Sequence, residues 1–231
     1  MNWVAGVDGC RAGWIVVLLR QTAGRWTHRV ALCRKFADVL ALDLPPTVIA
    51  IDMPIGLLNT PQPGGRTCDQ QARQLLGRRA SSIFTPPTRP MLEATHYDQV
   101  RVLGLSIQSF NILPKIQEVD QLMTPALQQR VHEAHPELAF MALAGAPLQH
   151  NKKTPEGREE RLRMLEGTFR GMRQAFESDC LAFKRAEVAR DDLLDAYVLA
   201  WTALRIGAGQ ANRVPTNPTI DAKGLWMEMW Y

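Results

Sequence analysis

Short apolar runs separated by polar turns dominate the start of the chain and predict β-structure. Residues 3–7, 14–19 and 26–32 are apolar or alternate between apolar and polar. Glycines at 9–13 and at 24 supply turns between these runs, so the three runs are expected to pair as an antiparallel meander.

The following segments predict a change to parallel pairing. Residues 36–42 form a short helical pattern that stops at two prolines, and the continuous apolar run 48–51 is typical of a strand buried on both faces. A right-handed crossover would lay run 48–51 beside the first strand. A fifth strand is expected at 130–134, followed by a helix that begins at Pro136.

The second half of the chain predicts mainly helices. Prolines and glycines break residues 59–130 into short amphipathic pieces, which indicates a helical insertion within a single domain of residues 1–231. Helices are expected at 155–169 and 171–184, and a long apolar helix from Asp191 to Gly207. The end of the chain is either a last strand or a packed tail. The expected fold class is therefore α/β, with a five-stranded mixed sheet flanked by helices.

Composition narrows the class of protein. The chain has 231 residues, of which 46% are apolar and 22% charged, and this suits a soluble globular protein. Its longest apolar stretch is too short to span a bilayer, and no export signal is evident, so we expect no membrane partner. Four scattered cysteines without metal-ligand spacing indicate free thiols and a cytoplasmic location. The net charge of +4 permits a polyanionic partner without demanding one. The sequence does not define the oligomeric state, and a homodimer is compatible with it.

Four aspartates stand where an α/β protein builds its sites. Asp8 ends the first predicted strand and Asp52 ends run 48–51, so their carboxylates are expected to be neighbours at one edge of the sheet. Asp192 and Asp195 are three residues apart and share one face at the start of the long helix. If that helix crosses the sheet above the strand ends, the four carboxylates converge.

Converging carboxylates predict a metal site. Such groups repel one another and take up protons unless a cation neutralises them. Oxygen ligands without accompanying histidine or cysteine favour Mg²⁺ or Mn²⁺. Two such ions about 3.5–4 Å apart can bind a phosphodiester, generate hydroxide and stabilise the leaving oxygen. This chemistry needs no histidine base and no covalent nucleophile.

Each acid also has a purely structural interpretation. An aspartate after a strand is often only a turn former, and Asp191 is better suited to cap the helix than to bind metal. Glu137 is an acid in the first turn of a helix, for which a structural role is favoured. The arginines between Arg73 and Arg89 are interpreted by default as a solvated face. The metal hypothesis therefore depends on the combination of acids.

Seven motifs, in order along nearly the whole chain, resemble an uncharacterised family of predicted ribonuclease H-like nucleases. They are VAGVDGCRAGW from Val4, IAIDMPIG from Ile49, GRRASSIF from Gly77, PKIQEVD from Pro114, HPE from His135, KKTPEGREER from Lys152 and DDLLDA from Asp191. The resemblance implies a ribonuclease H-like five-stranded mixed sheet. This agrees with the order of strands and helices expected from the apolar pattern.

The wider superfamily includes Holliday-junction resolvases, and the resemblance extends to their catalytic acids. Those proteins carry an acid on the first strand, an acid on the fourth and a D-x-x-D pair on a C-terminal helix. By this resemblance Asp8, Asp52, Asp192 and Asp195 are the catalytic and metal-binding residues. Asp52 stands where the resolvases have glutamate, which shortens its reach by one methylene. Glu137 matches the H-P-E motif and is a further catalytic candidate whose role stays open.

Basic residues in the same motifs are candidates for binding the substrate. Lys115, Lys153, Arg161 and Arg79 could contact phosphate groups. The resemblance implies nucleic acid as the partner and phosphodiester hydrolysis as the reaction, without defining the type of nucleic acid.

Two other classes of function stay open. Actin-like and sugar-kinase ATPases share this core, and D-G-C-R-A-G-W resembles their first phosphate loop. Those proteins need two such domains facing a cleft, which 231 residues hardly supply. The third class is a non-catalytic binding module on the same fold, which dispersal of the four acids in a structure would favour.

Overall fold

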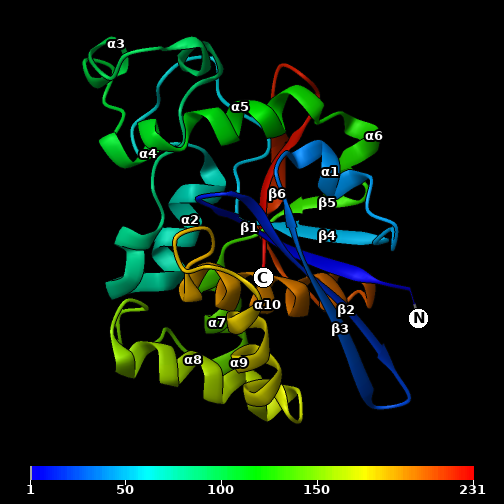
Figure 1. The fold of residues 1–231 in the computed structure, drawn as a ribbon. Coiled ribbons are helices and arrows are strands. Elements are labelled where there is room, and N and C mark those ends of the chain that lie inside the picture. The colour runs from blue at the N-terminus through cyan, green and yellow to red at the C-terminus, as the bar shows by residue number, and fades with distance from the viewer. Residues whose placement is uncertain (1) are drawn as a thin grey trace.

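A five-stranded mixed sheet forms the centre of the computed structural model, which describes residues 2–231 (Figure 1). The strand order is β3-β2-β1-β4-β5. Strands β1 and β3 lie antiparallel to β2, whereas β4 is parallel to both β1 and β5. This order confirms the predicted ribonuclease H-like sheet. The strands span β1 Val4–Cys10, β2 Gly13–Thr22, β3 Arg25–Cys33, β4 Val48–Ile51 and β5 Val131–Glu133.

Helices cover both faces of this sheet (Figure 1). One face carries the long helix α10, with three further helices packed around it. The other face carries a short helix and part of the segment between β4 and β5. The first layer consists of α7 Pro136–Ala144, α8 Pro155–Thr168, α9 Met172–Ala182 and α10 Arg190–Gly207. The second includes α1 Phe36–Leu40 and α5 Leu113–Leu122.

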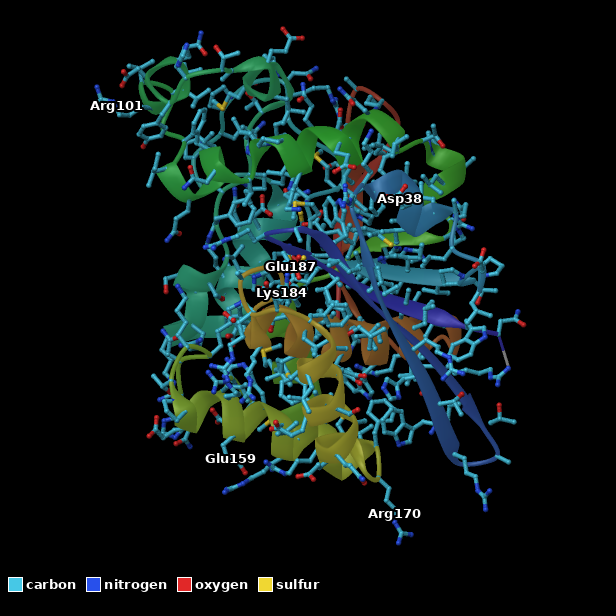
Figure 2. All side chains as sticks on the ribbon, viewed as in Figure 1. Asp38, Arg101, Glu159, Arg170, Lys184 and Glu187 are labelled. Carbon is cyan, nitrogen blue, oxygen red and sulfur yellow. The ribbon has the colours of Figure 1, made fainter. Side chains whose placement is uncertain are left out.

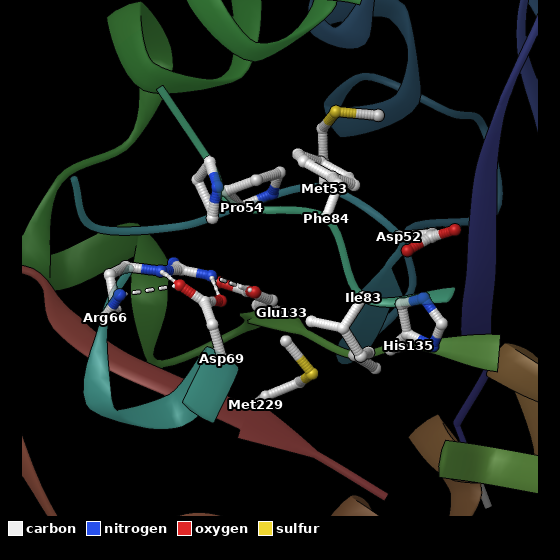
Figure 3. A pocket seen from close by; sticks show the side chains of 12 residues that line it. Asp52, Met53, Pro54, Arg66, Asp69, Ile83, Phe84, Glu133, His135 and Met229 are labelled. Atoms are coloured by element: carbon white, nitrogen blue, oxygen red, sulfur yellow. Dashed lines mark hydrogen bonds and ion pairs between the residues drawn. The ribbon is translucent and has the colours of Figure 1, made fainter. Parts of the chain in front are cut away.

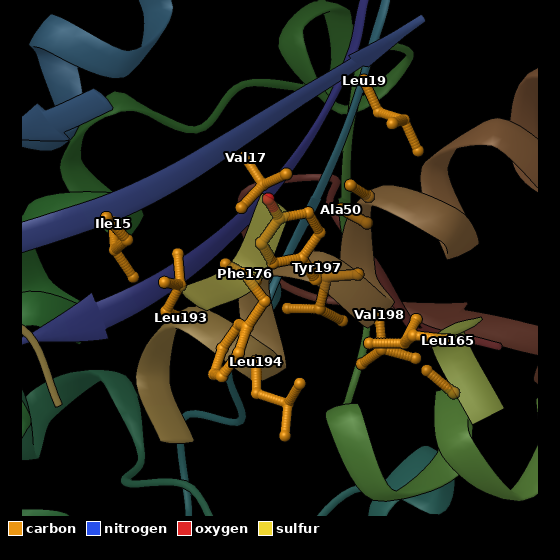
Figure 4. Close-up of a cluster of buried hydrophobic side chains, with 14 of the residues drawn as sticks. Ile15, Val17, Leu19, Ala50, Leu165, Phe176, Leu193, Leu194, Tyr197 and Val198 are labelled. Atoms are coloured by element: carbon orange, nitrogen blue, oxygen red, sulfur yellow. The ribbon is translucent and has the colours of Figure 1, made fainter. Parts of the chain in front are cut away.

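Alternation along the strands divides the core into two clusters. In β2, Ile15, Val17 and Leu19 face α10, and Tyr197 and Val198 of that helix belong to the same apolar cluster (Figure 4). The intervening β2 residues face the second helical layer. The sheet is therefore buried on both sides, as the apolar runs predict.

Helix α10 approaches β1 at Gly6. A Cβ atom at Gly6 would lie 2.0 Å from the Ala196 carbonyl oxygen and 2.1 Å from the Ala200 amide nitrogen. Only a residue without a side chain fits this crossing. The absence of a side chain at Gly6 therefore brings the start of α10 close to the end of β1.

The segment between β4 and β5 contains the short, interrupted helices that its prolines predict. Whether residues 59–130 form an insertion within one domain stays a prediction. In addition to α5, the segment holds α2 Thr67–Leu76, η1 Gly77–Ser82, η2 Arg89–Glu93, α3 Asp98–Arg101, α4 Ile107–Asn111 and α6 Pro125–Gln128.

A second, two-stranded sheet at the end of the chain differs from the expectation for this region. Strand β7 Trp226–Trp230 fulfils one of the two alternatives for the tail, but its antiparallel partner β6 Arg213–Ile220 was not anticipated. The sequence of β6 contains two prolines, which remove ladder donors and normally argue against a strand. Pairing is indeed irregular between Val214 and Thr219. A parallel bridge from Trp230 to Ala134 attaches this hairpin beside β5.

Charged side chains are spread over the outer surface. Arg101 projects from α3, and Glu159 and Arg170 lie at the opposite end of the molecule (Figure 2). Among residues 2–231, no helix combines the length and the apolar character needed to cross a bilayer. All four cysteines are free thiols, as their spacing predicts.

Candidate active site

Sheet register places the first two aspartates side by side. Val7 of β1 pairs with Ile51 of β4, so Asp8 and Asp52 are the next residues on adjacent parallel strands. The Asp52 amide donates a hydrogen bond of 3.0 Å to the Val7 carbonyl, which extends the ladder to this point. Both side chains point to the α10 face, because Gly6 and Ala50, two residues earlier, also face α10.

The start of α10 brings two more carboxylates to the same face. Asp195 is 1% exposed, one turn into the helix. Asp192 accepts a hydrogen bond of 3.0 Å from the Ala189 amide and so contributes to the N-terminal cap. The expectation that Asp191 caps the helix is therefore wrong, because the capping carboxylate lies one residue later. The other Asp192 oxygen makes no hydrogen bond within residues 2–231. The charges of the other three aspartates all act on Asp8, so the structure brings the four predicted acids into one electrostatic cluster.

Burial and mutual repulsion make these carboxylates unusually basic. Burial raises the pKa of Asp8 well above its ordinary value, and the charges of Asp52 and Asp195 raise it further. Burial also raises the pKa of Asp52 and of Asp192 to about 6. The pKa of Asp195 is raised by burial as well, against the effect of a nearby lysine. The cluster therefore requires a positive counter-charge when it is ionised.

That lysine is Lys152, which the sequence analysis missed. Its Nζ atom lies 2.5 Å from Asp195 Oδ2. The charge of Asp195 raises the Lys152 pKa, and Asp8 and Asp52 raise it further. The neighbouring Lys153, the predicted phosphate ligand, is exposed instead. Both lysines belong to the K-K-T-P motif, and no local pattern in the sequence distinguishes the one that turns inwards.

The chemistry of the donor set fits a hard divalent cation. All four side chains offer carboxylate oxygens, the ligands that a hard cation prefers. Burial raises the pKa of each of the four, and the charges of Asp52 and Asp195 add to this effect at Asp8. Within residues 2–231, however, no three acidic, histidine or cysteine side chains are already arranged around a common metal position. In this conformation the ammonium group of Lys152 supplies the counter-charge at Asp195.

Glu137 holds two arginines beside the cluster. Its Oε1 atom accepts hydrogen bonds from Arg161 Nη2 at 2.5 Å and Arg79 Nη2 at 2.9 Å, while Oε2 has no partner within residues 2–231. Arg161 is 1% exposed and also donates to the carbonyls of His150 and Gly157. The structure therefore places Arg161, a predicted phosphate ligand, inside the protein, and leaves Arg79 partly exposed.

A polar cleft adjoins the carboxylates. It has a volume of about 310 Å³ and opens between the segment that joins β4 to β5 and the loop that precedes α8. Its cationic lining residues are Arg79, Lys152 and Lys153, and Asp52 and Glu137 contribute its acidic groups. The cleft thus joins the carboxylate cluster to basic side chains that can receive phosphate.

Lys115 reaches the end of β1 beside Gly9. Its Nζ atom donates a 2.5 Å hydrogen bond to the Gly13 carbonyl and stands 4.5 Å from the centre of the Trp14 ring. Burial lowers the pKa of Lys115, although the charges of Cys10 and Glu118, and then those of Asp8 and Asp192, oppose that shift. A second cation therefore flanks the strand ends.

A buried ion network supports the loop that follows Asp52 (Figure 3). Arg66 Nη2 contacts Asp69 Oδ1 at 2.7 Å and Glu133 Oε1 at 2.6 Å. Arg66 Nη1 donates to the Ile55 carbonyl, and the Ile55 amide donates to Glu133 Oε2 at 2.7 Å. All three charged side chains are less than 5% exposed. The network therefore ties α2 and β5 to the backbone just beyond Asp52.

The interpretation of the basic stretch as a solvated face is wrong for its best-anchored members. Arg89 pairs with Asp120 and Asp221, and Arg73 donates to the carbonyls of Gly64 and Ile83. Arg78 is the arginine of this stretch that is exposed. Acids distant in the sequence therefore hold Arg89, whereas nearby backbone carbonyls hold Arg73.

Replacing Asp52 with asparagine is expected to stabilise the metal-free protein. The Asp52 pKa is about 6 in the folded chain and lower in the unfolded chain, so the folded protein holds the ionised carboxylate less favourably. The resulting loss of stability is complete above pH 6 and disappears at low pH. The gain in the free energy of unfolding should be about 1–2 kcal/mol at pH 8 and should shrink as the pH falls from 6 to about 4. Urea unfolding in EDTA at pH 8 and pH 5 measures both values. A variant less stable than the wild type at pH 8 contradicts this prediction.

One protein family matches most of this chain. The family model DUF429, described as a protein of unknown function, matches residues 6–220. The chain therefore belongs to the DUF429 family. This confirms the expected membership of an uncharacterised family.

Comparison with known proteins adds one distant structure. No curated protein matches the chain. A structure of T. thermophilus RuvC in complex with Holliday junction substrate is 14% identical, with a TM-score of 0.39, and the match covers 91% of this chain and 98% of that chain. The function must therefore be argued from the carboxylate site.

Proposed function

We propose that this member of the DUF429 family is a metal-dependent nuclease that hydrolyses phosphodiester bonds of nucleic acid. The observation that carries the proposal is the convergence of Asp8, Asp52, Asp192 and Asp195 from two strands and one helix. Groups whose pKa values are raised in this way, beside a cleft, are typical of functional sites. The expected location is the cytoplasm, and the expected partner is nucleic acid.

The four aspartates would hold Mg²⁺ or Mn²⁺. When bound, one or two such ions supply a nucleophilic water and stabilise negative charge on the phosphate. Asp8 and Asp195 are the most deeply buried of the four, at 8% and 1% exposure, and so are the best-fixed ligands. The half-buried Asp52 borders the cleft and would face an incoming substrate.

Side chains of the cleft would bind and orient the substrate. Arg79 and Lys153 line it and can contact phosphate oxygens. Glu137 holds Arg79 in place by the 2.9 Å ion pair, so its role is to position a phosphate ligand. Arg161 acts indirectly, through Glu137 and the loop at His150.

The nearby histidine is poorly suited to act as a base. His135 Nδ1 accepts from the Glu137 amide at 3.2 Å, and Nε2 lies 3.3 Å from the Ser82 carbonyl. Burial lowers the pKa of His135 to about 4, and both ring nitrogens are engaged. This supports a hydrolysis that depends on metal rather than on a histidine base.

A cleavage panel tests the proposal. The full chain is incubated with end-labelled single-stranded, duplex, hybrid and branched substrates in Mn²⁺ or Mg²⁺, and products are resolved by gel electrophoresis. We expect cleavage that EDTA abolishes and that Asp8→Asn reduces at least about 100-fold, since even outer partners of metal ligands contribute 10- to 100-fold.

Asp98→Asn serves as the matched control. Asp98 is an aspartate of α3 whose side chain is 87% exposed, so its substitution should leave cleavage unchanged. Cleavage that survives Asp8→Asn, or no cleavage of any substrate in the panel, contradicts the proposed function.

A further inference from the structure

We propose that Lys152 is an internal cation that neutralises the carboxylate cluster without metal and moves away when a divalent ion binds. The inference rests on the proposed function, because it assumes that the four aspartates take a metal. It assigns two states to Lys152, which is the counter-ion of Asp195 in one and a phosphate ligand in the cleft in the other.

The contacts of Lys152 support the first state. Its ammonium group lies 2.5 Å from Asp195 Oδ2, and Asp195 is almost completely buried. Asp8 and Asp52 also act on the ammonium group, so one cation serves several acids. Four ionised aspartates still outnumber a single lysine, and a divalent ion is therefore the stronger counter-charge. Metal and Lys152 compete for the same negative charge.

The backbone around Lys152 is fixed on both sides. Before it, the amides of Gln149 and His150 donate to the Glu160 carboxylate at 2.9 and 3.0 Å. After it, the Thr154 hydroxyl caps α8 by accepting from the Gly157 amide.

The first turn of α8 fixes the loop more closely still. A Cβ atom at Gly157 would lie 1.9 Å from the Asn151 carbonyl oxygen, so the loop lies directly against the helix. Arg161 adds a hydrogen bond of 3.2 Å to the His150 carbonyl. The exchange of Lys152 for a metal ion therefore requires rotation of its side chain alone. The motif KKTPEGREER has the physical role of presenting this lysine.

The cleft offers the displaced ammonium group a second position. Lys152 lines the cleft, and its side chain is 34% exposed. Glu137 lines the same cleft, and its Oε2 atom is buried without a partner within residues 2–231. An ammonium group moving away from Asp195 would find this acceptor, together with the phosphate of a bound substrate. Metal loading would thus convert the cluster's counter-ion into a phosphate ligand.

Mn²⁺ binding to the full chain tests the inference independently of catalysis. Isothermal titration calorimetry compares the wild type with Lys152→Gln and with Lys153→Gln, the matched control from the adjacent exposed position. We expect Lys152→Gln to bind Mn²⁺ at least about 10-fold more tightly, because the competing charge is gone. The metal-free variant should also have a lower Tm. Lys153→Gln should match the wild type in both measurements.

The outcomes separate this inference from the proposed function. Equal or weaker Mn²⁺ binding by Lys152→Gln, with a wild type that binds, overturns the role of Lys152 and leaves the nuclease proposal intact. Absence of Mn²⁺ binding by every variant overturns both. Binding by Lys152→Gln but not by the wild type supports the competition.

A second measurement does not depend on the stability of Lys152→Gln. In NMR of the full chain with ¹³C-labelled lysine, addition of Mg²⁺ should shift the Lys152 Cε resonance. Lys152→Arg, which keeps the charge, identifies that resonance by its loss. A Lys152 signal unchanged at saturating Mg²⁺ overturns the inference.

Discussion

Replacement of Gly6 with alanine is expected to prevent stable folding or to lower the free energy of unfolding by at least about 4 kcal/mol. The added Cβ would overlap the backbone of α10, at 2.0 Å from the Ala196 carbonyl oxygen. Backbone atoms cannot rotate away as a side chain can, so α10 must move from β1. Urea unfolding followed by circular dichroism measures the loss, and Mn²⁺ binding should disappear with it because Asp192 and Asp195 move with the helix.

A second glycine provides the control for Gly6. Gly167 lies in α8, and a Cβ atom there would meet nothing within 4 Å. Gly167→Ala should therefore be neutral or stabilising by up to about 1 kcal/mol, as is usual within a helix. If Gly6→Ala proves as stable as Gly167→Ala, the close crossing of β1 and α10 is contradicted.

Replacement of Arg66 with alanine is expected to lower the free energy of unfolding by about 3–5 kcal/mol. The substitution leaves Asp69 and Glu133 as buried carboxylates without their cation, and removes the donor to the Ile55 carbonyl. For a chain of this size the change corresponds to a fall in Tm of roughly 10 °C. Differential scanning calorimetry measures it.

Arg78→Ala tests whether the effect is specific to the buried network. Arg78 belongs to the same basic stretch but is exposed, so its removal should change the stability by no more than about 0.5 kcal/mol. Equal effects of the two substitutions would show that Arg66 is not the centre of a buried network.

Segments whose pattern is imposed by local physics could be predicted from the sequence. The apolar run 48–51 coincides with β4, and a helix does begin at Pro136. Asp8 and Asp52 could be paired because parallel strands end at the same edge of a sheet. The positions of the two apolar runs and the parallel direction of their strands were therefore sufficient to predict that these two acids are neighbours.

Features that depend on distant partners could not be predicted in this way. Arg66 can be buried because it forms an ion pair with Glu133, which is 67 residues away in the sequence. The inward turn of Lys152 rather than Lys153 depends on how the loop is anchored to Glu160 and Arg161. In each case the contact that fixes the side chain joins two residues that no hydrophobic pattern in the sequence connects.

The attachment of the C-terminal hairpin to β5 has a consequence for the behaviour of the protein in concentrated solution. An unpaired edge of a sheet invites strands from other molecules. Trp230 lies beside Ala134, directly after β5, and so covers part of the sheet edge that β5 forms. The opposite edge is β3, whose exposed Arg25 and Arg29 discourage addition of a further strand by charge. An aromatic side chain at one edge of the sheet and positive charges at the other therefore disfavour edge-to-edge aggregation.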